Sequence, residues 1–265
     1  MDHAHLTDRQ RREVEFHSAA LSHLVAAGTS VPFDCLNPNE SRWWNAYWRL
    51  YEYARALDLT GKKCLIVGCG CGRDAIAFSR LGADTYAFDL SPEQLSEAKQ
   101  LSEQYGLPVR FDQMASENLV YPSRFFDLVV AIDIIHHCEV RRSLAEILRV
   151  SKPGAIVPVN ELYTHSLLQR VRNTLLVEKC VYPFVARILY GRFRYVTADE
   201  RKLNERDLDL ICSSVKVSRL DFFEMIVKRF VVNTPSIAKL ETWLMAMSRA
   251  LHCDRERCFA CAPPS

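Results

Sequence analysis

A glycine-rich segment, Gly68-Cys69-Gly70-Cys71-Gly72, and an acid, Asp89, have the types and spacing that most clearly predict ligand binding. Glycine lets the backbone turn tightly and approach a ligand, and a helix that follows offers unpaired N–H groups. Asp89 comes about 20 residues after the first glycine, where a carboxylate can accept hydrogen bonds from the hydroxyls of an adenosine ribose. These residues therefore predict a site for an adenosine-containing ligand.

The glycine spacing does not fit a dinucleotide cofactor. The GxGxxG fingerprint requires glycine at position 73, where this chain has Arg73, and the third glycine comes one residue early. NAD and FAD are therefore disfavoured. The alternative is a glycine-rich turn that binds no ligand. It is less consistent with the order of features along the chain, in which a strand, the glycine loop, a helix, a second strand and the acid follow one another.

Short apolar segments alternate with helical patterns from residue 63 onward, which is typical of βαβ units around a parallel sheet. Ser91 and Pro92 predict the cap and first residue of one of these helices, and a turn is expected at 152–154. We expect strands at 64–67, 84–88, 109–111, 127–131, 155–159, 215–222 and 257–262, and helices at 73–81, 92–105, 142–150, 203–211 and 237–251.

The 265 residues are enough for one large α/β domain with additions. Two helical patterns, one with a dense aromatic face over 41–57, precede the alternating region. We expect an N-terminal helical cap (1–60), a cofactor-binding core (61–161), a helical insertion over the acceptor site (162–203) and the C-terminal part of the same domain (204–265).

Composition and charge limit the class of protein. With 49% hydrophobic and 25% charged residues the chain is typical of a globular protein. A net charge of +2 provides no strong field for nucleic acid. No segment approaches the ~20 apolar residues of a membrane span, and the charged start lacks the apolar core of a signal peptide. We expect a cytoplasmic protein with a small-molecule partner, and the oligomeric state stays open.

The ten cysteines are expected to be mostly small core residues, because the chain is long and several lie within apolar strands. His252, Cys253, Cys258 and Cys261 could together bind zinc. Structural zinc sites usually pair two separated CxxC knuckles, and residues 258–261 also have the pattern of a terminal strand. We therefore predict no metal.

Residues 60–160 resemble the class I S-adenosylmethionine-dependent methyltransferases, especially the quinone-biosynthesis and small-molecule branch. The resemblance is carried by CLIVGCGCG at 64–72, YAFDLSPEQLSEAK at 86–99 and FFDLVVAIDIIHHCEVRRSLAEILRVSKPGA at 125–155. It implies a Rossmann-like, mostly parallel seven-stranded sheet with helices on both faces. It also implies S-adenosylmethionine as cofactor and S-adenosylhomocysteine as product.

The same resemblance assigns the cofactor residues. The three glycines would approach the cofactor by their backbone, and Asp89 would hold the ribose hydroxyls. Adenine would lie between Leu90 and the segment Ala115-Ser116. The implied cofactor residues are Gly68, Cys69, Gly70, Gly72, Asp89, Leu90, Ala115, Ser116, Ala131 and Ile132.

Three departures from the family pattern concern the cofactor. Ile66 stands where the family usually has an acid that helps to orient the methionine moiety. Met114-Ala115 stands where many members have Gly-Asp, so Ser116 or Glu117 would have to contact the adenine amine. The stretch 223–257 is longer than the family's usual link between its last two strands.

A protonated acceptor would need a base, and ligands of such sheets lie at the carboxyl ends of the strands. His136 and His137 end the fourth strand, and Glu161 follows the fifth. We predict His137 and Glu161 as catalytic residues and Trp44, Tyr47, His136 and Tyr163 as substrate-binding residues. The alternatives are structural histidines, an exposed loop carboxylate and aromatic side chains that only fill the core.

We therefore expect a methyltransferase that acts on a small, partly apolar organic acceptor by in-line displacement. One alternative is a catalytically degenerate fold that binds partners, favoured by Ile66 and Ala115. Another is a methyltransferase for thiol or arsenic acceptors that uses cysteines such as Cys180 or Cys258.

Overall fold

The computed structural model describes residues 6–16, 31, 33–40, 46–161, 163, 174, 202–220 and 261–262. Several of our expectations lie outside these residues: Trp44, nearly all of the insertion at 162–203, the long stretch 223–257 with its helix at 237–251, most of the strand at 257–262, and Cys180, His252, Cys253 and Cys258. Of Cys261 only the backbone is described.

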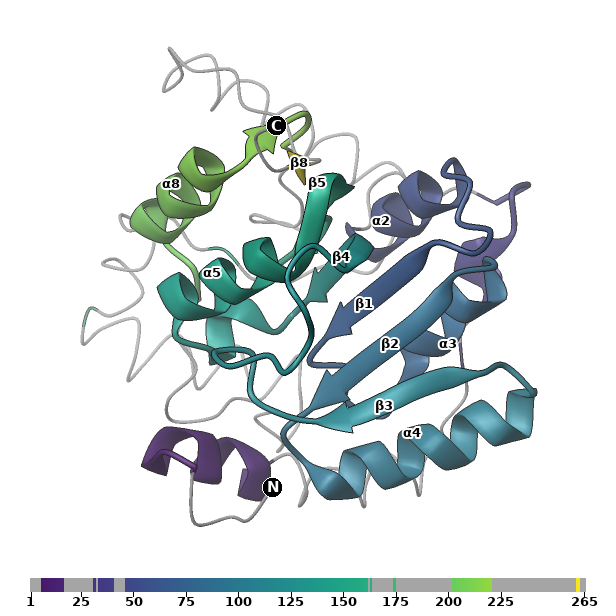
Figure 1. Cartoon of the computed structure of the whole chain (residues 1–265), viewed down its shortest axis with the longest axis horizontal. Helices are drawn as coiled ribbons and strands as arrows, with labels where there is room; N and C mark the ends of the chain where they lie inside the picture. The colour runs from purple at the N-terminus through teal and green to yellow at the C-terminus, as the bar shows by residue number, and fades with distance from the viewer. Residues whose placement is uncertain are drawn as a thin grey trace.

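The main sheet is parallel throughout its described pairings (Figure 1). Its strands run in the order β3-β2-β1-β4-β5, and β6 pairs with β4. Because the order reverses beside β1, the carboxyl ends of β1 and β4 mark the place at which open α/β sheets usually bind ligands. The strands are β1 (Lys63–Val67), β2 (Asp84–Asp89), β3 (Val109–Gln113), β4 (Phe126–Ile132), β5 (Ser151–Ile156) and β6 (Val159–Asn160).

Side chains of β1 enter two separate cores, one on each face of the sheet. Cys64 and Ile66 belong to one hydrophobic cluster, and Leu65 and Val67 to the other. This division follows from the period of two along a strand. Because both faces are covered, the strand is apolar from Cys64 to Val67 and does not alternate with polar residues.

Helices cover both faces of the sheet (Figure 1). The helix α2 contributes Trp48 and Tyr51 to the first cluster, and α5 contributes Leu144 and Ile147 to the second. The helices are α2 (Ala46–Arg55), α3 (Arg73–Arg80), α4 (Pro92–Tyr105), α5 (Val140–Val150) and α8 (Glu205–Ser214), with 3-10 turns η2 (Phe33–Leu36) and η3 (Ile135–His137). Residues 8–16 are also helical.

The expected helix at 92–105 is confirmed, and the side chain of Ser91 caps it by accepting a hydrogen bond from the N–H of Gln94. The expected turn at 152–154 is wrong as a separate element. These residues lie inside β5, whose pairing with β4 shifts register between Phe126 and Leu128. The Lys-Pro-Gly sequence is therefore accommodated as an irregularity in the strand, because Pro and Gly are tolerated at bulges.

The strand count differs from the seven we expected. Six described strands form the main sheet, whereas β7 (Lys216–Val217) and β8 (Cys261–Ala262) pair antiparallel in a sheet of their own. Among the described residues, no helix has the length and apolarity to cross a membrane. The described part of the chain also contains no group of three or more histidine, cysteine or acidic side chains that could hold a metal ion.

Candidate functional site

The glycine loop joins β1 to α3 at the carboxyl edge of the sheet, and Asp89 closes it. One carboxylate oxygen of Asp89 accepts a hydrogen bond from the N–H of Gly70 at 2.8 Å, and the other accepts from the N–H of Ser91 at 2.9 Å. A carboxylate has about four acceptor positions. Asp89 therefore holds the loop by two backbone N–H groups, at the place where the resemblance puts the hydroxyls of a ribose.

The glycines of the loop are held by close neighbours. A Cβ atom on Gly70 would lie 2.7 Å from Oε1 of Gln94, and one on Gly68 would overlap the side chain of Ile134. A Cβ on Gly72 would lie 2.7 Å from Cβ of Ala98 and 3.2 Å from its Cα. Gly72 therefore permits the close packing of α3 against α4, in addition to the role toward a ligand that the resemblance implies.

The remaining residues assigned to the cofactor are mostly buried. Leu90 is half-buried, and its carbonyl accepts a hydrogen bond from the side chain of Gln113. The other five are buried: Cys69, Ala115, Ser116, Ala131 and Ile132. Ile66, the first departure from the family pattern, is 2% exposed and fills the core on the face that α2 covers.

The two residues expected to replace the missing adenine contact are already hydrogen-bonded within the protein. The hydroxyl of Ser116 lies 2.8 Å from that of Ser143 and 3.0 Å from the sulfur of Cys138. The carboxylate of Glu117 accepts from the N–H of Glu139 and from the side chain of Gln10. The carboxylate of Asp89 is the kind of acceptor that a ribose requires, whereas the side chains of Ser116 and Glu117 are already committed to hydrogen bonds within the protein.

His136 and Glu161 form a buried pair at the carboxyl ends of β4 and β6. Nδ1 of His136 lies 2.7 Å from Oε2 of Glu161, and the two side chains are 2% and 5% exposed. Oε1 of Glu161 accepts hydrogen bonds from the N–H groups of Ile134 and Ile135 at 2.8 and 2.6 Å. Glu161 therefore ties the end of β6 to the start of η3, and both of its oxygens are engaged.

His137 faces a second glutamate, which the sequence analysis did not identify. Oε2 of Glu13, in the helical segment 8–16, lies 3.1 Å from Nδ1 of His137, but the two atoms do not form a hydrogen bond. The side chains are 8% and 14% exposed, and the rings of His136 and His137 lie 4.1 Å apart at their centroids. Two histidine–glutamate pairs thus lie side by side. No local signal in the sequence indicates the contact between residues 13 and 137.

Asp133 is another acid at this edge that the sequence analysis missed. The hydroxyl of Tyr47 donates to its carboxylate, and its backbone adopts a φ of +49°, in the left-handed region. Burial raises the pKa of Asp133, nearby Glu161 raises it further, and the bond from Tyr47 opposes this. Asp133 directly follows β4, so the rule that selected His136 and His137 would also have selected it.

Tyr163, predicted to bind substrate, is half-buried and forms an isolated parallel bridge with Leu203. Burial raises its pKa to about 12, with further increases from Glu205 and Asp209. The structure therefore brings Tyr47, His136, His137 and Glu161 to the carboxyl edge with the glycine loop, whereas Tyr163 contacts the start of the C-terminal part of the chain.

A second tyrosine of α2, Tyr51, donates to Asp74 in the first turn of α3. Burial raises the pKa of Asp74, and the bond from Tyr51 lowers it. The pKa of Asp74 is higher in the folded protein than in the unfolded chain. The free energy of unfolding therefore falls as pH rises from the unfolded-state pKa through the folded-state pKa. Removing the hydrogen bond from Tyr51 should increase the destabilisation that the ionised carboxylate of Asp74 causes at neutral pH.

We therefore expect Tyr51→Phe to lower the free energy of unfolding by about 1–3 kcal/mol at pH 7 and by clearly less at pH 4, as measured by urea denaturation. The matched control is Tyr105→Phe, because the hydroxyl of Tyr105 accepts from the N–H of Val31 and has no titrating partner in that bond. The decrease in the free energy of unfolding of Tyr105→Phe should be the same at pH 7 and pH 4. A loss in Tyr51→Phe that does not change with pH would contradict the assignment to Asp74.

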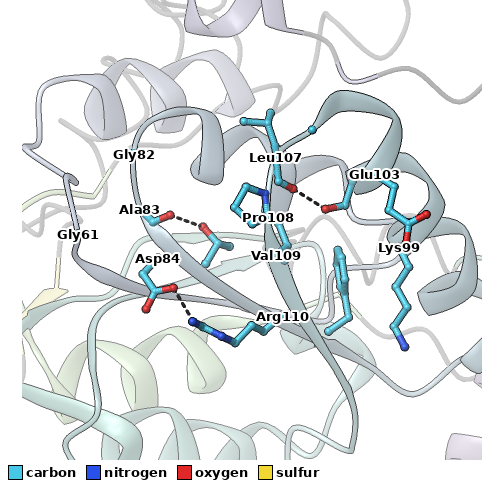
Figure 2. Close-up of a pocket in the computed structure, with 14 residues that line it drawn as sticks. Gly61, Gly82, Ala83, Asp84, Lys99, Glu103, Leu107, Pro108, Val109 and Arg110 are labelled. Atoms are coloured by element: carbon cyan, nitrogen blue, oxygen red, sulfur yellow. Dashed lines mark hydrogen bonds and ion pairs between the residues drawn. The ribbon is translucent and has the colours of Figure 1, made fainter.

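A cavity of about 600 Å³ lies at the opposite edge of the sheet, beside the amino ends of β2 and β3 (Figure 2). Its wall includes Gly82, Asp84, Lys99 and Arg110, and Nη1 of Arg110 lies 2.5 Å from Oδ1 of Asp84. None of the sequence-assigned site residues lines this cavity.

A parallel sheet in this order, with a glycine loop after β1 and an acid at the end of β2, defines a Rossmann-like nucleotide-binding domain. Residues 65–159 match the family described as "Methyltransferase domain". The solved structure of the YcgJ protein from Bacillus subtilis shares this fold with a TM-score of 0.52 at 16% identity, covering 80% of this chain and 92% of that one.

Relatives with assigned activities match the same region. A ubiquinone biosynthesis O-methyltransferase from Proteus mirabilis is 33% identical over 44% of this chain and 54% of that protein. A norajmaline N-methyltransferase from Rauvolfia serpentina is 32% identical over 43% of this chain and 40% of that protein. The chain thus spans about half the length of the curated relatives it matches. Residues 65–159 therefore match a methyltransferase domain and resemble the corresponding region of these O- and N-methyltransferases.

Proposed function

We propose that this chain transfers a methyl group from S-adenosylmethionine to a small, partly apolar organic acceptor. The observation that carries the proposal is Asp89, whose carboxylate closes the glycine loop through the N–H of Gly70 at the carboxyl end of β2. The match of residues 65–159 to a methyltransferase domain supports the same reaction.

The residues of the carboxyl edge would hold the cofactor as follows. Asp89 accepts hydrogen bonds from the ribose hydroxyls, and the backbone of the glycine loop leaves room for close approach. Leu90 and Ala115 provide apolar surface for adenine. Bound S-adenosylmethionine supplies a methyl group that is already activated on a sulfonium, so the chain must chiefly orient the acceptor and exclude water.

For acceptors that carry a proton, His137 suits the role of base better than Glu161 does. Both oxygens of Glu161 are engaged by His136 and by backbone N–H groups, so Glu161 would orient its neighbours. His137 is the more exposed of the two histidines. The N-terminal segment and residues 162–203 are proposed to cover the acceptor side.

The acceptor atom is left to experiment. The relatives named above include an O-methyltransferase and an N-methyltransferase. The cofactor-binding part of the domain does not distinguish an oxygen acceptor from a nitrogen acceptor. Ser116 and Glu117, already hydrogen-bonded, favour a second candidate function, a degenerate domain that binds a partner without cofactor.

Isothermal titration calorimetry with S-adenosylmethionine and S-adenosylhomocysteine, with NAD as the control, tests the proposal. We expect micromolar binding of both adenosyl ligands and no binding of NAD. Failure of both adenosyl ligands to bind would refute the methyltransferase proposal and favour the partner-binding domain. Binding of NAD in their place would contradict the interpretation of the glycine spacing.

A further inference from the structure

The segment that follows β3 lies directly beside Asp89 and Leu90. Strands β2 and β3 are neighbours in the sheet (Figure 1), and Asp89 is opposite Gln113. The N–H of Met114 donates to the carbonyl of Asp89 at 3.2 Å, and the side chain of Gln113 donates to the carbonyl of Leu90 at 3.0 Å. A base attached to a ribose at Asp89 would therefore border Leu90 and the residues that come after Met114.

These next residues, 115–118, form a turn. The N–H of Asn118 donates to the carbonyl of Ala115 at 3.1 Å. Ala115 is buried and has no polar side-chain atom, and Asn118 is exposed, so water competes for the hydrogen bonds of its side chain. Recognition of a purine by a buried side chain of this turn would therefore depend on Ser116 and Glu117.

The hydroxyl of Ser116 is directed at α5 and at the loop before it. Its oxygen lies 2.8 Å from the hydroxyl oxygen of Ser143 and 3.0 Å from the sulfur of Cys138. Ser116 and Ser143 are 5% and 1% exposed, so their contact lies within the protein. A ligand that bonded to this hydroxyl would have to leave a buried partner unsatisfied, which costs more free energy than the new bond returns.

The carboxylate of Glu117 connects two other elements. Oε1 accepts a hydrogen bond from the N–H of Glu139, the cap of α5, at 3.0 Å. Oε2 accepts one from the side chain of Gln10, in the helical segment 8–16, at 3.3 Å. Each oxygen is thus engaged by a different structural element, and Glu117 serves to hold the start of α5 and the segment 8–16 together.

We propose that Ala115 is a specificity-determining residue that leaves the 6-amino group of adenine unrecognised, so that the site also accepts cofactors whose purine lacks this group. The proposal rests on the methyltransferase function proposed above. Recognition comes from the ribose, through Asp89, and from apolar contact of the base with Leu90 and Ala115. The class of cofactor is therefore a purine riboside with a sulfur-linked methionine side chain and either an amino group or hydrogen at C6.

The presence or absence of an acceptor at C6 changes affinity by a measurable amount. A site that binds the amino group through a carboxylate loses at least about tenfold in affinity when that group is removed, because the carboxylate is left without its partner. A site with no acceptor loses little, because the amino group gains no protein partner on binding. The two cases can therefore be separated by a single pair of ligands.

The ligand pair is S-adenosylhomocysteine and its analogue in which hydrogen replaces the 6-amino group. N1 is an acceptor in both, so the compounds differ in the amino group alone. In titration calorimetry we expect the wild-type chain to bind the analogue at most about threefold more weakly than S-adenosylhomocysteine. A larger loss would overturn the present proposal and leave the methyltransferase function standing. If the wild type binds neither ligand, both proposals fail.

The assignment to Ala115 is tested by adding the missing acceptor. Ala115→Asp introduces a carboxylate, and Ala115→Asn introduces a neutral acceptor that keeps the test valid if the charge prevents folding at this buried position. We expect Ala115→Asp to prefer S-adenosylhomocysteine over the analogue by about tenfold or more, and Ala115→Asn by about threefold or more.

The matched control is Ala115→Val, which adds a side chain of similar size without an acceptor and should keep the wild-type ratio of affinities. Urea denaturation verifies that each variant is folded. Equal affinity for the two ligands in the folded acceptor variants would overturn the assignment of Ala115 as the determinant.

Discussion

Asp89→Asn should weaken the binding of S-adenosylhomocysteine by well over tenfold. The carboxylate closes the glycine loop through Gly70 and, in the proposed function, accepts hydrogen bonds from the ribose. Hydrogen bonds to a charged group contribute about 1.5–3 kcal/mol, and about 1.4 kcal/mol corresponds to a tenfold change in affinity. Asparagine keeps the size of the side chain but loses the charge and one acceptor oxygen, and its NH₂ group would oppose a backbone N–H.

The matched control is Asp84→Asn, at the other end of the same strand β2. Asp84 pairs with Arg110 on the exposed edge that faces away from the glycine loop, so its replacement should leave the affinity within twofold. Titration calorimetry measures both variants, and urea denaturation verifies that each is folded. Equal affinities of Asp89→Asn and the wild type would refute the assignment of Asp89 to the ribose.

Gly72→Ala should lower the free energy of unfolding by about 2–5 kcal/mol. A left-handed φ, here +81°, costs an L-residue about 1–2 kcal/mol. The added Cβ would also lie 2.7 Å from Cβ of Ala98 and 3.2 Å from its Cα, and overpacking of this kind costs about 1–3 kcal/mol. The backbone of α4 cannot move aside as a flexible side chain could.

The comparison that isolates the packing contribution is Gly106→Ala. Gly106 has a φ of +63°, and a Cβ there would meet nothing within 4 Å, so only the conformational cost of about 1–2 kcal/mol applies. Urea denaturation of both variants at one pH gives the difference directly. If the two variants lose the same stability, the contact between Gly72 and α4 does not constrain the third glycine of the loop.

The local elements could be predicted because their signals lie within a few residues of one another. The glycines and the following helix, the cap formed by Ser91, and the apolar β1 and β4 all depend on backbone preference and periodicity. The parallel sheet followed from the alternation of strands and helices, because parallel strands need long crossover connections. The irregularity of β5 at residues 152–154, where we expected a turn, could not be predicted in this way, because it depends on the register between β5 and β4.

The sequence by itself determined the parallel α/β core, the glycine loop and its acid Asp89. The tertiary structure alone decided what the titratable groups at the carboxyl edge do. His136 and His137 are adjacent in the chain, yet one is paired with Glu161 and deeply buried, and the other is paired with Glu13. These partners come from segments far apart in sequence. Hydrogen-bond partners and burial depend on which surfaces pack together, whereas periodicity and capping report only what a segment does with its own neighbours.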